Sequence, residues 1–369
     1  MRVVRVLAKL EPGGAQLALL RVMRGLQRRH GIPAELWVGD ASSDGMRLAR
    51  RYGVRPVAHR VGKDLHPDHN LQWQLSDRFA QWLAAELPIG DVVHAHMLGA
   101  WWAVAQVIDP RTPLVATEHN QVNWQARRIR ALRPAASRVD RFFAMGPAAA
   151  RFAVQAGVPA AALRSARSPV AGFQARPDNR LRTPRLTFTG RLCPDKGPDL
   201  LVEAIGMLGD PDLSCYLLGD GPLAADLAAR VEQLGLADRV FLPGWVDRPW
   251  TYLAGSAVHV VPSREEAWSQ SAVLALGLGV PVIGTRVDGL AETLAQQRGV
   301  LVPPEDPAAL SRAIAEIRGG RAVLDQPAAR RYARQFSSAR VSDFYHDQYR
   351  ELVEHNLARS VIAADGGRP

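Results

Sequence analysis

The chain has 369 residues, of which 47% are hydrophobic and 22% charged, a balance that is typical of folded globular proteins and excludes a disordered chain. This length predicts two domains, each long enough to bury its own core. The formal net charge of +10 favours anionic partners such as nucleotide diphosphates, phospholipid surfaces or nucleic acid, and charge alone does not select among them. The two cysteines, Cys193 and Cys215, lack paired spacing and fit a reducing compartment.

The amino terminus predicts one short strand over residues 1–10. Arg5 and Lys9 interrupt its apolar residues and a Pro-Gly-Gly turn follows, so the segment lacks the apolar core of a secretory signal. No later run has the length of apolar residues that a membrane span needs. We therefore expect a cytoplasmic protein.

Strand-like and helix-like segments alternate along the first half of the chain. Such alternation predicts a parallel sheet covered by helices. The expected strands lie at residues 3–7, 34–38, 91–96 and 113–117, and the expected helices at residues 16–29 and 101–108.

The alternation stops between residues 164 and 184, which are polar and contain several prolines, as is typical of a linker. It resumes with expected strands at 186–189, 213–218, 240–242, 258–261 and 280–283, and ends with a helix at 339–357. We therefore predict an N-terminal domain at 1–168, a linker at 169–184, a C-terminal domain at 185–338, and a helix with its tail at 339–369.

A turn with two cations follows the first strand of the second domain. It reads Gly190-Arg191-Leu192-Cys193-Pro194-Asp195-Lys196-Gly197 and leads into an amphipathic helix. Open α/β sheets bind their ligands at the carboxyl ends of strands. Lys196 is also one of only three lysines in a chain that otherwise uses arginine. Arg191 and Lys196 therefore predict a site for a phosphate pair.

Three further patterns carry weaker signals. Residues 219–224 spell G-x-G-x-x-A, which is either a dinucleotide-binding fingerprint or a helix-starting turn, and Pro222 favours the turn. Residues 210–212 match a D-x-D metal pattern but also a plain turn. Residues 66–69 contain two histidines and an aspartate without a third ligand, so no metal site is predicted.

The most specific order of motifs runs from residue 258 to residue 292. A strand, a polar turn, a small-residue helix and a second strand lead into Asp288-Gly289. Together with residues 190–197 and 219–222, this order resembles family 4 of the bacterial retaining glycosyltransferases, the glycosyl transferases group 1. The resemblance implies an α/β GT-B fold, in which two Rossmann-like parallel-sheet domains face a central cleft. The first would be the acceptor side, the second would bind a nucleotide-sugar, and the C-terminal helix would cross back.

The resemblance also implies roles for individual residues. Arg191 and Lys196 match the cations on the donor diphosphate, Glu266 matches the first carboxylate of an E-x7-E motif that holds the donor sugar, and His119 matches the histidine of a T-x-H segment beside that sugar. Ser269 fits a donor contact and a plain helix cap equally well. The implied donor-binding residues are Gly13, Gly14, Gly190, Gly219, Gly221, Val246, Ser269, Gln270 and Ser271.

The second carboxylate of that motif is missing, because Leu274 stands at its position. In the family this glutamate holds the nucleotide ribose, and leucine has no atom that can do so. Either Ser271 or another neighbour replaces it, or ribose recognition is weaker in this chain.

The sequence contains fewer specific signals for the residues that would bind the acceptor. Trp101, Trp124, Glu118 and Asn120 are candidate acceptor contacts, although core packing explains a tryptophan equally well. His94 and His96 share one face of their strand, where they either line the site or are satisfied by internal partners. The arginines between residues 127 and 141 either attract an anionic membrane or a phosphorylated acceptor, or form a solvated face.

We therefore expect a retaining, metal-independent hexosyltransferase without a cofactor. It would move a hexosyl or N-acetylhexosaminyl group from a UDP-sugar to a hydroxyl of a small soluble acceptor, such as an aminocyclitol in antibiotic biosynthesis or a thiol precursor. Two alternatives stay open. One is an enzyme weakly associated with a membrane that acts on a cell-envelope lipid or polysaccharide precursor, and the other is a nucleotide-sugar-binding protein without turnover. No nucleic-acid partner is expected, and the oligomeric state is left open.

Overall fold

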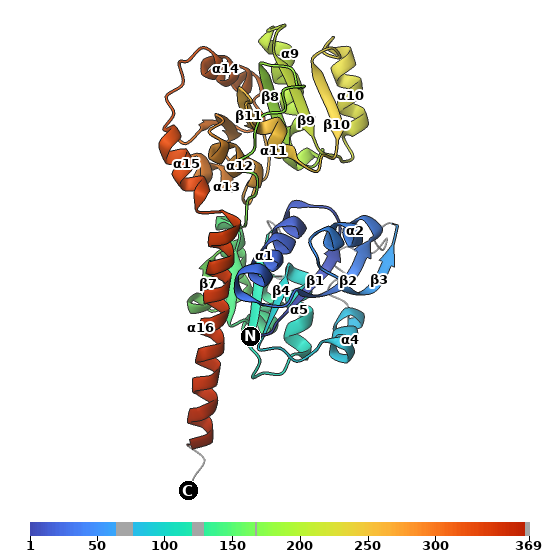
Figure 1. Cartoon of the computed structure of the whole chain (residues 1–369), viewed down its shortest axis with the longest axis vertical. Helices are drawn as coiled ribbons and strands as arrows, with labels where there is room; N and C mark the ends of the chain where they lie inside the picture. Colours follow the sequence, from blue (N-terminus) through green and yellow to red (C-terminus); the bar gives the residue numbers. More distant parts are fainter. Residues whose placement is uncertain (64–76, 120–128, 167, 366–369) are drawn as a thin grey trace. The chain divides into compact units, whose positions relative to one another are not determined.

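The computed structural model describes residues 1–63, 77–119, 129–166 and 168–365. They form two compact units (Figure 1). Unit 1 comprises Met1–Pro169 and Ser338–Pro369, and unit 2 comprises Val170–Ser337. Each unit contains its own parallel sheet with helices between successive strands, which confirms the predicted fold class.

Unit 1 has a seven-stranded sheet in the order β3-β2-β1-β4-β5-β6-β7, and every neighbouring pair runs parallel. Its strands are β1 Val3–Leu10, β2 Glu35–Ser42, β3 Val57–Gly62, β4 Val92–His96, β5 Leu114–Glu118, β6 Arg141–Ala144 and β7 Leu163–Ser165. Its helices are α1 Gly14–His30, α2 Ser43–Arg51, α4 Asp77–Glu86, α5 Leu98–Val107, α7 Arg133–Ala136, α8 Pro147–Ala156 and α16 Ser338–Asp365. All residues of β4 and β5 are buried, as expected for central strands with helices on both faces.

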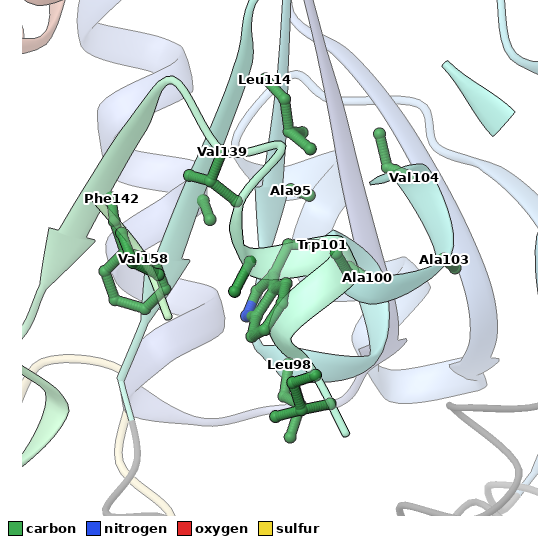
Figure 2. Packing of buried hydrophobic residues seen from close by; sticks show 14 of the residues in the cluster. Ala95, Leu98, Ala100, Trp101, Ala103, Val104, Leu114, Val139, Phe142 and Val158 are labelled. Atoms are coloured by element: carbon green, nitrogen blue, oxygen red, sulfur yellow. The ribbon is translucent and has the colours of Figure 1, made fainter. Parts of the chain in front are cut away.

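Trp101 lies at the centre of the core of unit 1 (Figure 2). Its side chain is fully buried and meets the ring of Phe142 edge-on, with 6.2 Å between the ring centroids. The expectation that Trp101 contacts an acceptor is therefore corrected. The apolar surface of this large ring is used to pack α5 against the sheet.

Unit 2 has a six-stranded parallel sheet in the order β10-β9-β8-β11-β12-β13. Its strands are β8 Arg185–Thr189, β9 Ser214–Leu218, β10 Val240–Gly244, β11 Val258–Val261, β12 Val282–Thr285 and β13 Val300–Val302. Its helices are α9 Pro198–Leu208, α10 Ala224–Gln233, α11 Pro249–Leu253, α12 Gln270–Leu278, α13 Asp288–Leu294, α14 Pro307–Arg318 and α15 Gln326–Arg334.

The segment that was expected to be a linker packs largely within unit 2. Val170 is buried and donates its backbone N–H to the carbonyl of Phe336 at 2.8 Å. Phe173 and Leu181 pack against the same apolar cluster, which lies around α12. Residues 170–184 are polar on average, and these few apolar side chains fix them to the unit.

The final helix, α16, packs on unit 1, which confirms that it crosses back to the first domain. Val341, Tyr345, Tyr349 and Leu352 recur at helical spacing and are buried against α1 and the sheet. Arg141 of β6 adds an ion pair with Glu351 at 3.1 Å. Within the described residues, α16 and the other helices lack the combined length and apolarity of a membrane span.

The packing of α16 gives a stability prediction. Tyr345 is 3% exposed whereas Leu357, on the same helix, is 61% exposed. Tyr345→Ala should lower the free energy of unfolding of unit 1 by about 3 kcal/mol, because it removes a buried ring. Leu357→Ala should change it by less than about 0.5 kcal/mol. Urea denaturation followed by tryptophan fluorescence measures both, and equal losses in the two variants would show that α16 is not docked as described.

Candidate active site

The loop that follows β8 carries Arg191 and Lys196 and is held by its own backbone. The N–H of Leu192 donates to the carbonyl of Asp220 at 2.9 Å, which joins this loop to the one after β9. A Cβ at Gly219 would come 1.9 Å from the carbonyl oxygen of Gly190, and one at Gly221 would come 2.4 Å from that of Leu192. The two glycines of the G-x-G pattern therefore allow two loops to touch, as the turn interpretation requires.

Lys196 forms an ion pair with Glu266. The Lys196 Nζ lies 2.8 Å from Glu266 Oε2, and the hydroxyl of Ser263 donates to the same oxygen at 3.3 Å. The lysine side chain is 29% exposed and the glutamate side chain 10% exposed. The ion pair is thus formed in the folded chain, and the partly exposed ammonium group of Lys196 can still bind a further anion.

The loop that carries Glu266 is fastened on both sides. The N–H groups of Arg264 and Glu265 donate to the carbonyl of Asp195 at 2.8 and 3.1 Å. On the other side, the N–H of Gly289 donates to the carbonyl of Glu266 at 2.9 Å. Any side chain at Gly289 would meet this loop, because a Cβ there lies 2.1 Å from the carbonyl oxygen of Ala267.

Arg191 differs from the other cations of this region. Its side chain is exposed and makes no hydrogen bond or ion pair with the part of the chain that the structure describes. Arg191 therefore presents a positive charge without a side-chain partner among the described residues, beside the Lys196–Glu266 pair at the carboxyl edge of the sheet. An anion at this edge would therefore gain favourable electrostatic energy.

The first turn of α12 supports the capping interpretation of Ser269. Its hydroxyl accepts from the N–H of Ala272 at 3.2 Å and lies 3.3 Å from the hydroxyl of Ser271. Gln270 is the first residue of this helix. A donor role for these three residues stays a prediction, as it does for Val246, which follows β10 and packs against an apolar cluster.

Leu274 is 6% exposed and belongs to the same apolar cluster, with Leu218 and Leu290 among its members. The position at which the resemblance predicts a ribose-binding carboxylate is therefore apolar. Nothing at this side chain can accept a hydrogen bond from a sugar hydroxyl.

In unit 1, the candidate residues meet at the carboxyl edge of the sheet. Gly13 and Gly14 follow β1 and begin α1, and His119 follows β5. The N–H of His119 donates to Glu118 Oε1 at 3.0 Å. Glu118 is 1% exposed, so its carboxylate is directed at the chain itself, and the expectation that it contacts an acceptor is corrected.

The two alternating histidines of β4 have different surroundings. His94 has a partner at each ring nitrogen, Tyr349 and Thr117, both at 2.6 Å. His96 is 5% exposed, and neither of its ring nitrogens has a partner in the described structure. His96 and His119 instead line a small pocket that also includes Ser168. The interpretation of a histidine satisfied by internal partners is confirmed for His94, and a site-lining role for His96 stays a prediction.

Burial determines the charge of these rings. It lowers the pKa of His119 to about 4 and the pKa of His96 well below its ordinary value, to which the charges of neighbouring groups add for His96. The pocket is consequently lined by neutral imidazoles at pH 7. Such a pocket suits hydroxyl groups better than charged ones.

Some predicted residues lie outside the described part of the chain. These are Asn120, Trp124 and the histidine-containing segment at residues 66–69. Within the described residues there is no group of three or more His, Cys, Asp or Glu side chains that could hold a metal ion. Asp210, of the D-x-D pattern, pairs with Arg318 at 3.1 Å and forms a turn with the N–H of Asp212.

Comparison with known proteins identifies the class to which this fold and site belong. The model of Glycosyltransferase Family 4 matches residues 12–166, and that of Glycosyl transferases group 1 matches residues 183–318. The D-inositol 3-phosphate glycosyltransferase of Salinispora arenicola is 32% identical over 329 residues, which cover 81% of this chain and 72% of that protein. The chain therefore belongs to family 4 of the glycosyltransferases, as its motifs predict.

Other relatives match over shorter stretches. The 2-deoxystreptamine glucosyltransferase of Streptomyces kanamyceticus is 33% identical over 150 residues, 39% of this chain and 37% of that protein. The D-inositol 3-phosphate glycosyltransferase of Jonesia denitrificans is 32% identical over 168 residues, 41% of this chain and 39% of the relative. The chain thus matches about two fifths of the length of these two relatives.

Solved structures share the fold. Anabaena Alr3699/HepE in complex with UDP and glucose superposes with a TM-score of 0.78 at 19% identity, over 94% of this chain and 99% of that one. Sucrose-phosphate synthase from Thermosynechococcus elongatus gives 0.75 at 19% identity, over 96% and 100%. The fold of this chain is therefore GT-B.

The surroundings of the half-buried His119 predict its titration. Its ring should stay neutral from pH 7.5 to 5.5, because burial lowers its pKa to about 4 from an ordinary value of 6.5. The unfolded chain takes up this proton first, so the group makes the free energy of unfolding fall as the pH drops through that interval. NMR of histidine-labelled protein, with His119→Gln to assign the signal, checks this. A ring that titrates near pH 6.5 would show that the surroundings of His119 do not lower its pKa as described.

Proposed function

We propose that this chain is a retaining glycosyltransferase that uses a nucleotide-sugar, with UDP as the nucleotide. It moves a hexosyl or N-acetylhexosaminyl group to a hydroxyl of a small acceptor, such as an aminocyclitol, another secondary-metabolite precursor or a thiol precursor. The observation that carries the proposal lies in unit 2. Arg191, which has no side-chain partner among the described residues, and the Lys196–Glu266 pair lie on two loops that backbone hydrogen bonds join.

The two cations bind the diphosphate of the donor in this proposal. When the bond between the sugar and the diphosphate breaks, negative charge grows on the departing phosphate, and fixed positive groups stabilise it most effectively when they are oriented beforehand. Arg191 supplies a planar guanidinium that suits phosphate oxygens, and Lys196 supplies a point charge. Neutralisation by these two side chains is the basis for proposing that the reaction needs no metal.

Glu266 binds hydroxyl groups of the donor sugar. A carboxylate can accept hydrogen bonds from two vicinal hydroxyls. Its hydrogen bond to Lys196 keeps it oriented for this task. The acceptor hydroxyl attacks from the face that the leaving group vacates and gives its proton to the departing phosphate, so the anomeric configuration is retained and no side-chain nucleophile is needed.

The names of relatives support the choice of substrates. Solved structures with this fold are described in complex with UDP, with UDP and glucose, and with UDP-glucose. The relatives named for D-inositol 3-phosphate and for 2-deoxystreptamine act on cyclic acceptors that carry several hydroxyl groups. The neutral rings of His96 and His119 can each exchange a hydrogen bond with a hydroxyl group of such a ligand.

Donor binding can be tested with two matched lysines. Lys196→Ala should weaken UDP-glucose binding at least about 10-fold, because it removes a charged hydrogen bond to the diphosphate. Lys9 is the control, since it also pairs with a glutamate at 2.8 Å but lies in β1. Lys9→Ala should leave the affinity unchanged. Thermal shift and isothermal titration measure both, and equal binding by Lys196→Ala and the wild type would overturn the donor site.

Leu274 predicts an unusual tolerance for the nucleotide. UDP and 2′-deoxy-UDP should bind with affinities within about threefold of each other, because leucine makes no hydrogen bond to a ribose hydroxyl. Competition titrations against UDP-glucose would measure the ratio. A preference for UDP greater than about tenfold would show that another residue of unit 2 has taken over ribose recognition.

The same leucine favours a second candidate function, a nucleotide-sugar-binding protein without turnover. The two candidates differ in one measurement, the release of UDP from UDP-glucose in the presence of inositol phosphate or 2-deoxystreptamine. Steady UDP release that depends on the acceptor supports the transferase. Tight donor binding without release, for every donor and acceptor tested, supports the binding protein.

A further inference from the structure

A chain of buried polar groups joins the C-terminal helix to the sheet of unit 1. Nδ1 of His94 lies 2.6 Å from the hydroxyl of Tyr349, and Nε2 lies 2.6 Å from the hydroxyl of Thr117. All three side chains are at most 1% exposed. They come from α16, β4 and β5, so residues that are far apart in sequence meet at one imidazole.

The ionic state of this chain follows from its surroundings. Burial, with added repulsion from Arg5 and His119, lowers the pKa of His94 well below its ordinary value, so the ring is neutral. A neutral imidazole donates through one nitrogen and accepts through the other. Arg5 is also buried, and its guanidinium carbon lies 5.9 Å from the centre of the Tyr349 ring.

The direction of the hydrogen bonds can be assigned from these partners. Arg5 has only donors, and its positive charge favours a phenol whose oxygen faces it and whose proton points away. Tyr349 then donates to Nδ1 of His94, and Nε2 of His94 donates to Thr117. Removal of the phenol hydroxyl would leave Nδ1 of a buried imidazole without a donor, which favours a rotated ring or the other tautomer.

Thr117 begins the segment that leads to His119. Its carbonyl accepts from the N–H of Met97 at 2.7 Å, so the end of β5 is fixed to the end of β4. The ring of His96 also stacks on that of His94, with centroids 4.0 Å apart, and lies 6.4 Å from that of His119. A movement of His94 would therefore reach His119 both through the backbone and through the stacked rings.

We propose that Tyr349 is a positioning residue for His119, which it controls from the C-terminal helix through His94 and Thr117. The proposal rests on the proposed function insofar as His119 lies beside the substrate. It gives α16 a role beyond covering apolar surface, since one hydroxyl of this helix sets the orientation of a candidate active-site ring.

The direct test compares two tyrosines of unit 1. Tyr349→Phe removes the hydroxyl and keeps the buried ring, and Tyr52→Phe is the control, because the hydroxyl of Tyr52 has no partner in the described structure. In full-length, histidine-labelled protein, Tyr349→Phe should shift the ring signals of His94 and His119, whereas Tyr52→Phe should not. Unchanged His119 signals in a folded Tyr349→Phe variant would overturn the proposal.

A double-mutant cycle separates positioning from general destabilisation. Tyr349→Phe should lower kcat about 10-fold with little change in the KM for the donor, since a small misplacement of a group beside the substrate is costly. In a His119→Ala background the same change should have less than about a twofold effect. An equal loss of kcat in both backgrounds would show that Tyr349 acts independently of His119 and would overturn the proposal. If the wild type transfers no sugar at all, the proposed function fails, and the NMR comparison still decides the positioning role.

Discussion

The carbonyl group of Asp195 holds the candidate donor site together. It accepts two hydrogen bonds, from the successive N–H groups of Arg264 and Glu265, and so joins the two loops that follow β8 and β11. Lys196 on one loop and Glu266 on the other are therefore at ion-pair distance without any ligand. A long, flexible lysine loses rotational freedom on binding a phosphate, and the ion pair with Glu266 already restricts Lys196 in the folded chain.

Three cations near this junction have three different functions in the structure. Arg264 is structural, because it contacts Asp199 and Glu305 and donates to the carbonyl of Pro194, and the two carboxylates raise its pKa. Lys196 is shared with a carboxylate, and Arg191 has no partner in the described structure. A residue type alone would not distinguish them. The three side chains differ in the number of carboxylates that lie at ion-pair distance. Arg191 has none in the described structure, so its charge stays available at the carboxyl edge of the sheet, where α/β proteins bind ligands.

The sequence predicts the central strands well because their residues are apolar on both faces, whereas β3, β6, β7 and β13 escape it. These four strands are short or lie at or near a sheet edge, so their patterns are interrupted. In the candidate site, Arg191 and Lys196 could be predicted from their position in the loop after a strand, because α/β sheets bind ligands at the carboxyl ends of their strands. The wrong predictions of acceptor contacts came from burial. The sequence does not indicate that neighbouring side chains cover Trp101 and Glu118.

Burial also determines which residue type suits position 274. Its cluster contains Leu218, Val261 and Leu290, so a glutamate in this place would be buried among apolar side chains. An unpaired carboxylate there would cost several kcal/mol or become protonated. The neighbourhood thus suits leucine, which packs within this apolar cluster. In the function proposed above, Leu274 adds no hydrogen bond to the ribose, so the contacts of Arg191 and Lys196 with the diphosphate carry more of the affinity for the donor.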